Sequence, residues 1–313
     1  MSVAVALLSA CGGSQPIGAP PGAIPQSAAL ATHATRGTSW MLPAAKGGDL
    51  LYIADAGSNK GVDVYSYPGG KLVGMLDVEA SPFGECVSAD GDVFVVEANQ
   101  IVEYAHGGTK PIETLNIAGS EQTAWSCAVD STTGSLAVTR WGYSEDGDVL
   151  VYPKASGTPI MYANIPGVSN PYYCVYDEQG NLFVVGQKGI YQFGFDELTK
   201  GSNTFFHIQL ERRMGLLKAR GGVQWDGRHV VLAGKTNYIY QYRLHGAEGS
   251  RAGHTMLENH TYVSAFWIQG QQVVVPSGES VMIYDYPAGG TATKTITGFG
   301  QPTAAVVSLG RSH

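Results

Sequence analysis

The sequence predicts an all-β fold, a six-bladed β-propeller made of four-stranded antiparallel blades. A β-rich unit of four strands occupies residues 82–119. It recurs along the chain, and the last residues repeat its first strand. Four antiparallel strands in about forty residues correspond to one propeller blade.

The unit is recognised by its strand and turn residues. Its strands are rich in Val, Ile, Phe, Tyr and Thr, which suit a pleated, buried surface. Asp90-Gly91 and Gly107-Gly108 lie between strands, where such pairs form hairpin turns. The expected strands are Glu85–Ser88, Asp92–Glu97, Ile101–Tyr104 and Pro111–Ile117.

The repeats are clearest in the inner and second strands. Repeats begin near residues 82, 123, 171, 221, 262 and 302. The expected second strands are Leu50–Ala54, Asp92–Val96, Ser135–Thr139, Asn181–Val185, His229–Ala233 and Gln272–Val275.

The C-terminal strand is expected to close the ring. Residues 302–308 resemble residues 82–88 position by position, yet no blade follows them. The first blade, residues 50–78, has three clear strands. We therefore expect the tail to complete the first blade, which removes exposed sheet edges.

The N-terminus is expected to lie outside the fold. Residues 3–8 are apolar but too few to span a bilayer as a helix. Leu8-Ser9-Ala10-Cys11 resembles a bacterial lipoprotein signal, in which Cys11 becomes lipidated; the alternative is an apolar tail around an ordinary cysteine. Residues 12–38, rich in Gly, Pro, Ala and Thr, suit a disordered tether. The predicted organisation is a signal segment (1–11), a tether (12–38) and a propeller (39–313), in a lipid-anchored protein of the cell envelope, periplasmic or on the cell surface.

The charge narrows the class of partner. The net charge is −7, from 26 acidic against 19 basic residues. Nucleic acids are polyanions that bind basic surfaces, so this acidic protein is not expected to bind them. Membrane contact is expected only through the lipid on Cys11, and the protein is expected to be a monomer.

Three cysteines, Cys86, Cys127 and Cys174, fall on the inner strands of neighbouring repeats. The other repeats carry Val or Phe there, which favours packing as small apolar side chains. A disulfide and a metal site are the alternatives, although no C-x-x-C pair is present.

Candidate ligand-binding residues are expected at one end of the ring. In a propeller, the turns between second and third strands share a face with the blade-to-blade connections. The expected residues are Asp55, Asn59, Glu97, Arg140 and Trp141 from strand ends, and Phe83, Glu85, Trp125, Tyr172, Tyr173 and Tyr262 from the connections.

This face has two notable groups. Its aromatic side chains suit sugars, peptides or ring-shaped ligands, or else they wedge between blades. Its carboxylates, Asp55, Glu85 and Glu97, could hold Ca²⁺, or else pair with Arg140 and lysines or stay solvated.

No catalytic motif is present in the sequence. The eight histidines are scattered without zinc-site spacing. No G-x-S-x-G nucleophile elbow occurs.

The repeat resembles those of NHL-type and gluconolactonase-like six-bladed propellers. It shares a Pro- or Gly-led inner strand, a D-x-x-G turn and an I-x-x-Y third strand. Tyr-Pro-Gly-Gly at 67–70 and Trp-Asp-Gly at 225–227 also resemble phrases in uncharacterised bacterial lipoproteins. The enzyme resemblance implies one divalent cation over the channel, for which Asp55, Glu85, Glu97 and Asn170 are the nearest equivalents.

The favoured function is a lipid-anchored, non-catalytic module that binds a protein, peptide or saccharide and needs no cofactor. The alternative is a lactonase or related hydrolase that depends on Ca²⁺ or another divalent cation. Fold alone does not decide between them, because one scaffold hosts both.

Overall fold

A computed structural model describes residues 38–58, 60–117, 122–144, 147–189, 192–211, 216–260 and 262–310. The chain divides into two units, residues 1–36 and 37–313, and all described residues belong to the second. Cys11, the predicted signal segment, Asn59 and all of the predicted tether except residue 38 lie outside the described residues.

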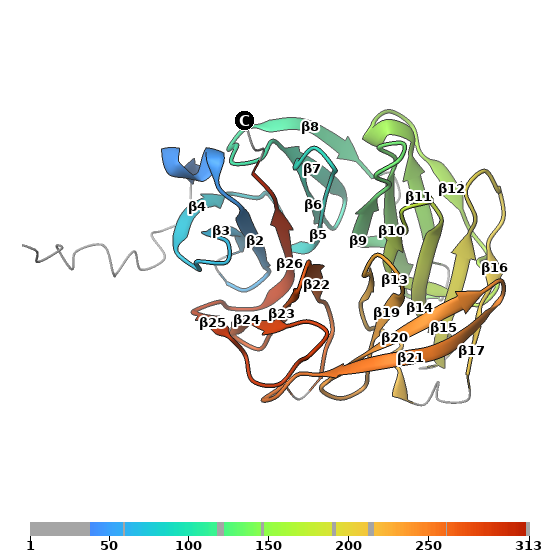
Figure 1. The fold of residues 1–313 in the computed structure, drawn as a ribbon. Coiled ribbons are helices and arrows are strands. Elements are labelled where there is room, and N and C mark those ends of the chain that lie inside the picture. Colours follow the sequence, from blue (N-terminus) through green and yellow to red (C-terminus); the bar gives the residue numbers. More distant parts are fainter. Residues whose placement is uncertain are drawn as a thin grey trace, which may run out of the picture. The chain divides into compact units, whose positions relative to one another are not determined.

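The second unit is an all-β propeller of six sheets around a centre (Figure 1). Blades 1 to 3 contain β1 (Trp40–Met41), β2 (Leu50–Asp55), β3 (Gly61–Ser66), β4 (Leu72–Leu76) and β26 (Pro302–Ser308); β5 (Pro82–Val87), β6 (Val93–Glu97), β7 (Gln100–Tyr104) and β8 (Pro111–Asn116); β9 (Gln122–Val129), β10 (Leu136–Gly142), β11 (Asp148–Tyr152) and β12 (Ile160–Tyr162).

Blades 4 to 6 follow the same plan. They contain β13 (Asn170–Tyr176), β14 (Leu182–Lys188), β15 (Gln192–Leu198) and β16 (Phe206–His207); β17 (Gln209–Leu210), β18 (Val223–Trp225), β19 (Val230–Ala233), β20 (Tyr238–His245) and β21 (Glu248–Met256); β22 (Trp267–Gln269), β23 (Gln272–Ser277), β24 (Ser280–Asp285) and β25 (Lys294–Thr297).

Blades 1 and 5 each add a fifth strand at the outer edge. β1 pairs antiparallel with β4, and β17 pairs parallel with β21. The helices in the described ranges are two short 3-10 segments, η2 (Pro43–Gly47) and η3 (Pro153–Ala155). No helix among the described residues is long and apolar enough to cross a membrane.

The predicted closure of the ring is confirmed. β26 pairs antiparallel with β2 as the innermost strand of blade 1, and Figure 1 shows this red strand beside the blue ones. Side chains also tie β26 to blade 2. Ser308 Oγ donates to the Gly91 carbonyl at 2.6 Å, and Thr303 Oγ1 donates to the Pro82 carbonyl at 2.9 Å.

The core consists of six apolar clusters, one between each pair of neighbouring blades. Successive residues of a strand point to opposite faces of the sheet, so each blade supplies both of its neighbours. In β6, Val93 and Val95 pack toward blade 1, whereas Phe94 and Val96 pack toward blade 3. This arrangement explains why the strands read as continuous apolar runs.

All six inner strands line a narrow central cavity of about 30 Å³. It is bounded by Glu85 of β5, Cys127 of β9, Tyr173 of β13, Val223 of β18 and neighbouring residues of β22 and β26. We call the end of this channel where the inner strands begin the mouth, and the end where they finish the turn end.

Three inner strands, β5, β9 and β13, begin earlier than the sequence predicted. Phe83, Trp125, Tyr172 and Tyr173 lie in strands, whereas they were expected in connections between blades; Glu85, expected at the junction of a connection and a strand, lies inside β5. The physical reason is a β-bulge in β5, β9 and β13, past which strand pairing continues. Of the six residues expected in the connections, Tyr262 lies outside a strand.

Candidate functional site at the channel mouth

Three bulges place an aromatic side chain at the mouth in three consecutive blades. Pairing skips Phe83 between Pro82 and Gly84, Trp125 opposite the Thr139/Arg140 step, and Tyr172 between Pro171 and Tyr173. A bulged residue is released from the ladder and its side chain is re-aimed. Thr303 takes the same place in blade 1.

The three aromatic residues form one continuous group with Trp141 of β10 and Tyr143 just after it, which we call the mouth cluster. Phe83 stacks on Trp125 with ring centroids 5.3 Å apart, and Trp125 meets Tyr172 edge-on at 5.6 Å. Trp141 stacks on Tyr172 at 6.5 Å and contacts Tyr143 at 4.8 Å. The cluster therefore runs across blades 2, 3 and 4.

The mouth cluster has a buried base and an exposed rim. Tyr172 is 2% exposed, whereas Tyr143 is 88% exposed. Phe83, Trp125 and Trp141 are partly exposed. The sequence left two alternatives for these aromatic residues, packing between blades and exposure at the mouth. The structure shows both, because Tyr172 is packed between blades and Tyr143 is exposed.

A close approach of the backbones holds the cluster together. A side chain at Gly84 would place its Cβ 2.4 Å from the Trp125 carbonyl oxygen. Glycine at this position therefore allows β5 and β9 to meet directly beneath the Phe83–Trp125 stack.

Blade 5 carries two cationic side chains, of which Arg220 contacts the cluster. The Arg220 guanidinium lies 5.0 Å from the Tyr172 ring centroid, and its Nε donates to Gln187 Oε1 at 3.3 Å. Lys218 Nζ lies 3.9 Å from the Tyr262 ring centroid and donates to Ser264 Oγ at 2.6 Å. Burial lowers the pKa of Lys218 to about 8.

Two predicted aromatic residues lie apart from the cluster's stacked rings. Tyr173 lines the central cavity, where burial raises its pKa to about 12 against a smaller opposing effect of the Trp125 indole N–H. Tyr262 is 52% exposed on the connection between blades 5 and 6, beneath Lys218.

The predicted acids at the strand ends brace loops. Asp55 accepts hydrogen bonds from the amides of Gly57, Gly300 and Gln301 at 2.7–2.9 Å. Glu97 accepts from the Ala80 amide at 2.5 Å and from Gln100 Nε2 at 3.2 Å. Burial raises the pKa of Glu97, and these two hydrogen bonds lower it in part. Each acid thus holds the connection that enters the inner strand of its own blade.

Arg140 and Asn170 also have structural partners in blades 3 and 4. Arg140 pairs with Asp148 through Nε at 2.7 Å and Nη2 at 2.6 Å, and both residues are buried. Asn170 accepts from the Gly142 amide at 2.9 Å and donates to the Gly142 carbonyl at 3.0 Å.

Glu85 is buried in the wall of the channel and faces blade 1. Neither carboxyl oxygen has a hydrogen-bond partner of good geometry among the described residues. Burial raises the pKa of Glu85 well above its ordinary value of 4.5; the Ala54 amide opposes this in part, and repulsion by Asp63 adds to it. A proton on Glu85 is thus favoured in the folded protein.

The four nearest equivalents of a metal-binding set do not form one site. Asp55, Glu97 and Asn170 belong to separate loop networks, and Glu85 points between blades 1 and 2. In the described part of the chain, no group of three or more His, Cys, Asp or Glu side chains is placed to hold a metal ion. The residues present therefore do not fit the implied divalent cation.

The cysteine interpretation is wrong for two of the three residues. Cys86 and Cys127 form a disulfide between the inner strands of blades 2 and 3, whereas Cys174 is free and buried. Cys127 and Cys174 each pair with the third residue of the second strand, but Cys86 pairs with the second residue, Phe94. This shift of one residue turns Cys86 to the opposite face, toward Cys127.

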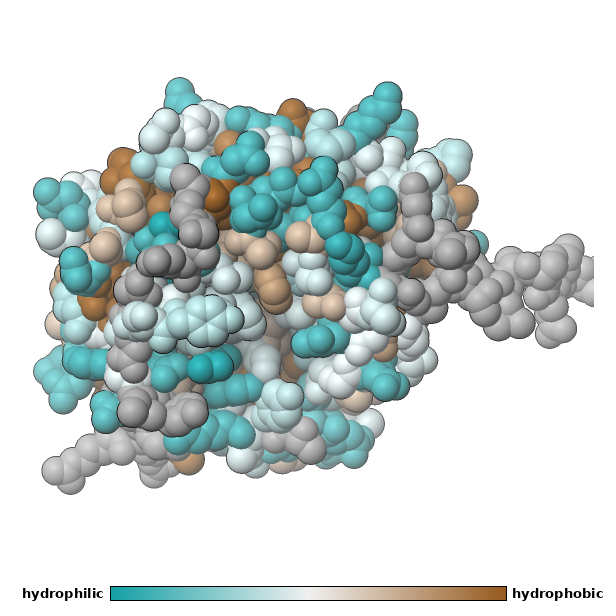
Figure 2. Space-filling model, turned by 180° about the vertical axis from the view of Figure 1, so that it is seen from behind, coloured by the Kyte–Doolittle hydropathy of each residue, from teal (hydrophilic) through white to brown (hydrophobic). Residues whose placement is uncertain are grey.

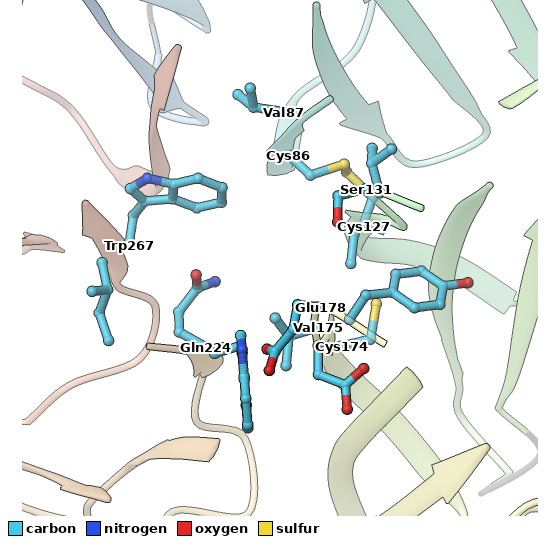
Figure 3. A pocket seen from close by; sticks show the side chains of 15 residues that line it. Cys86, Val87, Cys127, Ser131, Cys174, Val175, Glu178, Gln224 and Trp267 are labelled. Atoms are coloured by element: carbon cyan, nitrogen blue, oxygen red, sulfur yellow. A yellow bond between two sulfur atoms is a disulfide. The ribbon is translucent and has the colours of Figure 1, made fainter. Parts of the chain in front are cut away.

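A second concave site lies at the turn end of the channel (Figure 3). It is a pocket of about 240 Å³ lined by residues at the ends of five inner strands. Figure 3 shows Gln224 and Trp267 pointing into this pocket, with the disulfide in its wall.

On the side of the molecule seen in Figure 2, hydrophilic and hydrophobic residues are interspersed.

Sequence reasoning missed Arg220 and the turn-end pocket, and it favoured packing over the disulfide, which it named as an alternative. Arg220 was detectable, because it lies shortly before the inner strand that begins at Val223, as the aromatic residues of other blades do. The disulfide needs the strand register, which the cysteine spacing alone conceals.

Among comparisons with known proteins, those with solved structures found similar folds. No family model matches the chain, and no curated protein sequence matches it. A chain from the crystal structure of a nidogen/laminin complex is similar over 85% of this chain and 100% of its own length, with 14% identity and a TM-score of 0.67.

Two further solved structures are similar. A protein of unknown function from Bacteroides caccae has 10% identity and a TM-score of 0.59 over 83% of this chain and 99% of its own. The β-propeller domain of Myceliophteria thermophila Cps50 (Swd1) has 8% identity and a TM-score of 0.53 over 86% of this chain and 88% of its own. Such low identities establish the β-propeller fold alone.

Proposed function

We propose that this protein is a non-catalytic binding module that uses the mouth cluster to bind a protein or peptide partner. The observation that carries the proposal is the continuous aromatic surface from Phe83 to Tyr143, with Arg220 beside it. Trp, Tyr and Arg are the residues enriched at the energetic centres of protein interfaces.

The geometry suits recognition. The inner strands fix the base of the cluster through the buried Tyr172, so little side-chain freedom is lost when a partner binds. Trp141 Nε1 is buried without a hydrogen-bond partner in the described structure. The similar nidogen/laminin structure is itself a complex of proteins, which is consistent with this use of the fold.

A peptide-display selection on the purified full chain tests this proposal. Selected peptides should lose about 10-fold or more in affinity for Tyr143→Ser and Arg220→Ala, because alanine-scan hot spots cost about 2 kcal/mol. Ile112→Ser is the matched control, since Ile112 is 55% exposed on the outer strand β8.

Peptides that bind all three variants equally would place the binding surface elsewhere. A glycan array run in parallel addresses the saccharide alternative. If glycans bind through Tyr143 and no peptide does, the protein-partner proposal is wrong.

We also propose that the protein is lipid-anchored through Cys11 outside the cytoplasm. The disulfide supports this location independently of the N-terminal sequence, because structural disulfides persist in oxidising compartments. In bacterial cells fed a clickable fatty acid, the wild-type chain should be labelled and Cys11→Ser should not. Equal labelling of both, or a fully reduced Cys86–Cys127 pair in cells, would contradict the proposal.

A further inference from the structure

The turn-end pocket is separate from the mouth cluster and has its own chemistry. Its volume is larger than that of the central cavity, about 240 Å³ against about 30 Å³. Typical drug-sized pockets are roughly 300–1,000 Å³, so this one suits a smaller ligand.

Aromatic and aliphatic side chains make up most of its walls. Trp225, Trp267 and Tyr176 contribute aromatic surface from three different blades. The aliphatic part of the wall consists of Val87, Ala128, Val129, Val175 and Ile268. Aromatic faces carry negative potential and attract cations as well as rings.

The polar groups of the pocket favour positive charge. Asp177 and Glu178 line it, and no Lys, Arg or His is among its described lining residues. Asp177 is held by the amides of Gln179 and Asn181 at 3.0 and 2.8 Å, which fixes its carboxylate in the turn.

Besides the two carboxylates, the pocket offers a ligand the amide group of Gln224. The Gln224 side chain points into the pocket and makes no hydrogen bond to another described residue (Figure 3). A ligand with a polar or charged end and an apolar body would use both the walls and these groups.

We propose that the turn-end pocket binds a small organic cation, an ammonium group carried on an aromatic or short apolar body. The body packs between Trp225 and Trp267, and the ammonium group lies toward Glu178 and the Gln224 amide oxygen. Each element of the ligand is therefore matched by side chains at the ends of the inner strands. The proposal does not depend on what the mouth cluster binds.

Calorimetric titration of the purified full chain at pH 7 tests this with three ligands of nearly equal size. These are 2-phenylethylammonium, the neutral 2-phenylethanol and the anionic phenylacetate. We expect the cation to bind about 10-fold more tightly than either of the others, within the range of about 2- to 30-fold that cation–π contacts give.

Two variants locate the site. Glu178→Gln should reduce the preference for the cation by about 3-fold or more, whereas Gln224→Glu, which adds a carboxylate, should increase cation affinity. Misfolding would lower the affinity for the cation, so an increase in Gln224→Glu would be a specific effect of the added carboxylate. Glu79→Gln, an exposed acid at the mouth, is the matched control and should leave all three affinities unchanged.

The proposal is overturned by equal affinities for the three ligands, or by no measurable binding of the cation to the wild-type chain and to Gln224→Glu. It is also overturned if the cation preference survives Glu178→Gln and Gln224→Glu unchanged, because the cation would then bind elsewhere.

Discussion

Glu85 occupies the position in blade 2 that Cys127 and Cys174 occupy in blades 3 and 4. Each of the three residues pairs with the third residue of its second strand. The neighbouring blades therefore fill this place with a small apolar group, and blade 2 fills it with a carboxyl group. A buried carboxyl group without good partners destabilises the fold when it is charged.

The stability of the protein is expected to depend on pH through Glu85. In the unfolded chain this carboxyl loses its proton near pH 4.5, whereas burial keeps the proton on in the folded protein to a higher pH. The contribution of Glu85 to stability is therefore most favourable below about pH 4.5 and falls as the pH rises toward the folded pKa, by up to about 1.4 kcal/mol per pH unit.

Glu85→Gln removes this titration and should raise the melting temperature at pH 8, but not at pH 4. For a domain of this size, each kcal/mol corresponds to about 2–4 °C. Thermal unfolding followed by circular dichroism at both pH values measures the difference. The exposed Glu79→Gln should follow the wild type, and a Glu85→Gln variant that is less stable at pH 8 would contradict this account.

At the scale of single residues, the sequence predicted where the polar side chains lie in the blades but not which groups they bind. Asp55, Glu97 and Arg140 lie at strand ends as expected, but they hold loop amides or Asp148 rather than one another. Such roles depend on which loop of the adjacent blade reaches each side chain, and that is set by tertiary packing.

At the scale of elements, the inner strands position both candidate sites. The bulges aim aromatic side chains at the mouth, and the strand ends carry the walls of the turn-end pocket. The sequence predicted that these strands exist, yet it placed the start of β5 at Glu85, whereas the strand begins at Pro82. Pairing beyond a bulge leaves no periodic signal in the sequence, because the extra residue breaks the alternation.

The disulfide joins β5 to β9 and should stabilise these two strands against separation. The two cysteines are 41 residues apart, and closing such a loop is worth up to about 4 kcal/mol in the unfolded chain. The double variant Cys86→Ala, Cys127→Ala should therefore lose about 2–4 kcal/mol in denaturant unfolding.

The reducing agent gives the control for this prediction. Reduction should destabilise the wild type and Cys174→Ala but leave the double variant unchanged. A double variant as stable as the wild type would show that the two strands are held by packing alone.

At the scale of the whole molecule, the sequence was most informative. A repeat of roughly constant length specifies a ring, and a final inner strand without a blade specifies how the ring closes. The six apolar clusters between blades make every blade depend on two neighbours. The loss of one strand at the closure therefore exposes two clusters, those between blades 1 and 2 and between blades 6 and 1.

Truncation of the C-terminus tests the closed ring most directly, because both candidate sites depend on the inner strands that surround the channel. Deletion of residues 301–313 removes β26 and is expected to remove about 5 kcal/mol or more, which abolishes the cooperative thermal transition. Deletion of residues 311–313, which leaves β26 intact, should melt like the full chain. If the chain without residues 301–313 melts cooperatively at the wild-type temperature, the ring is not closed by its last strand and the account is wrong.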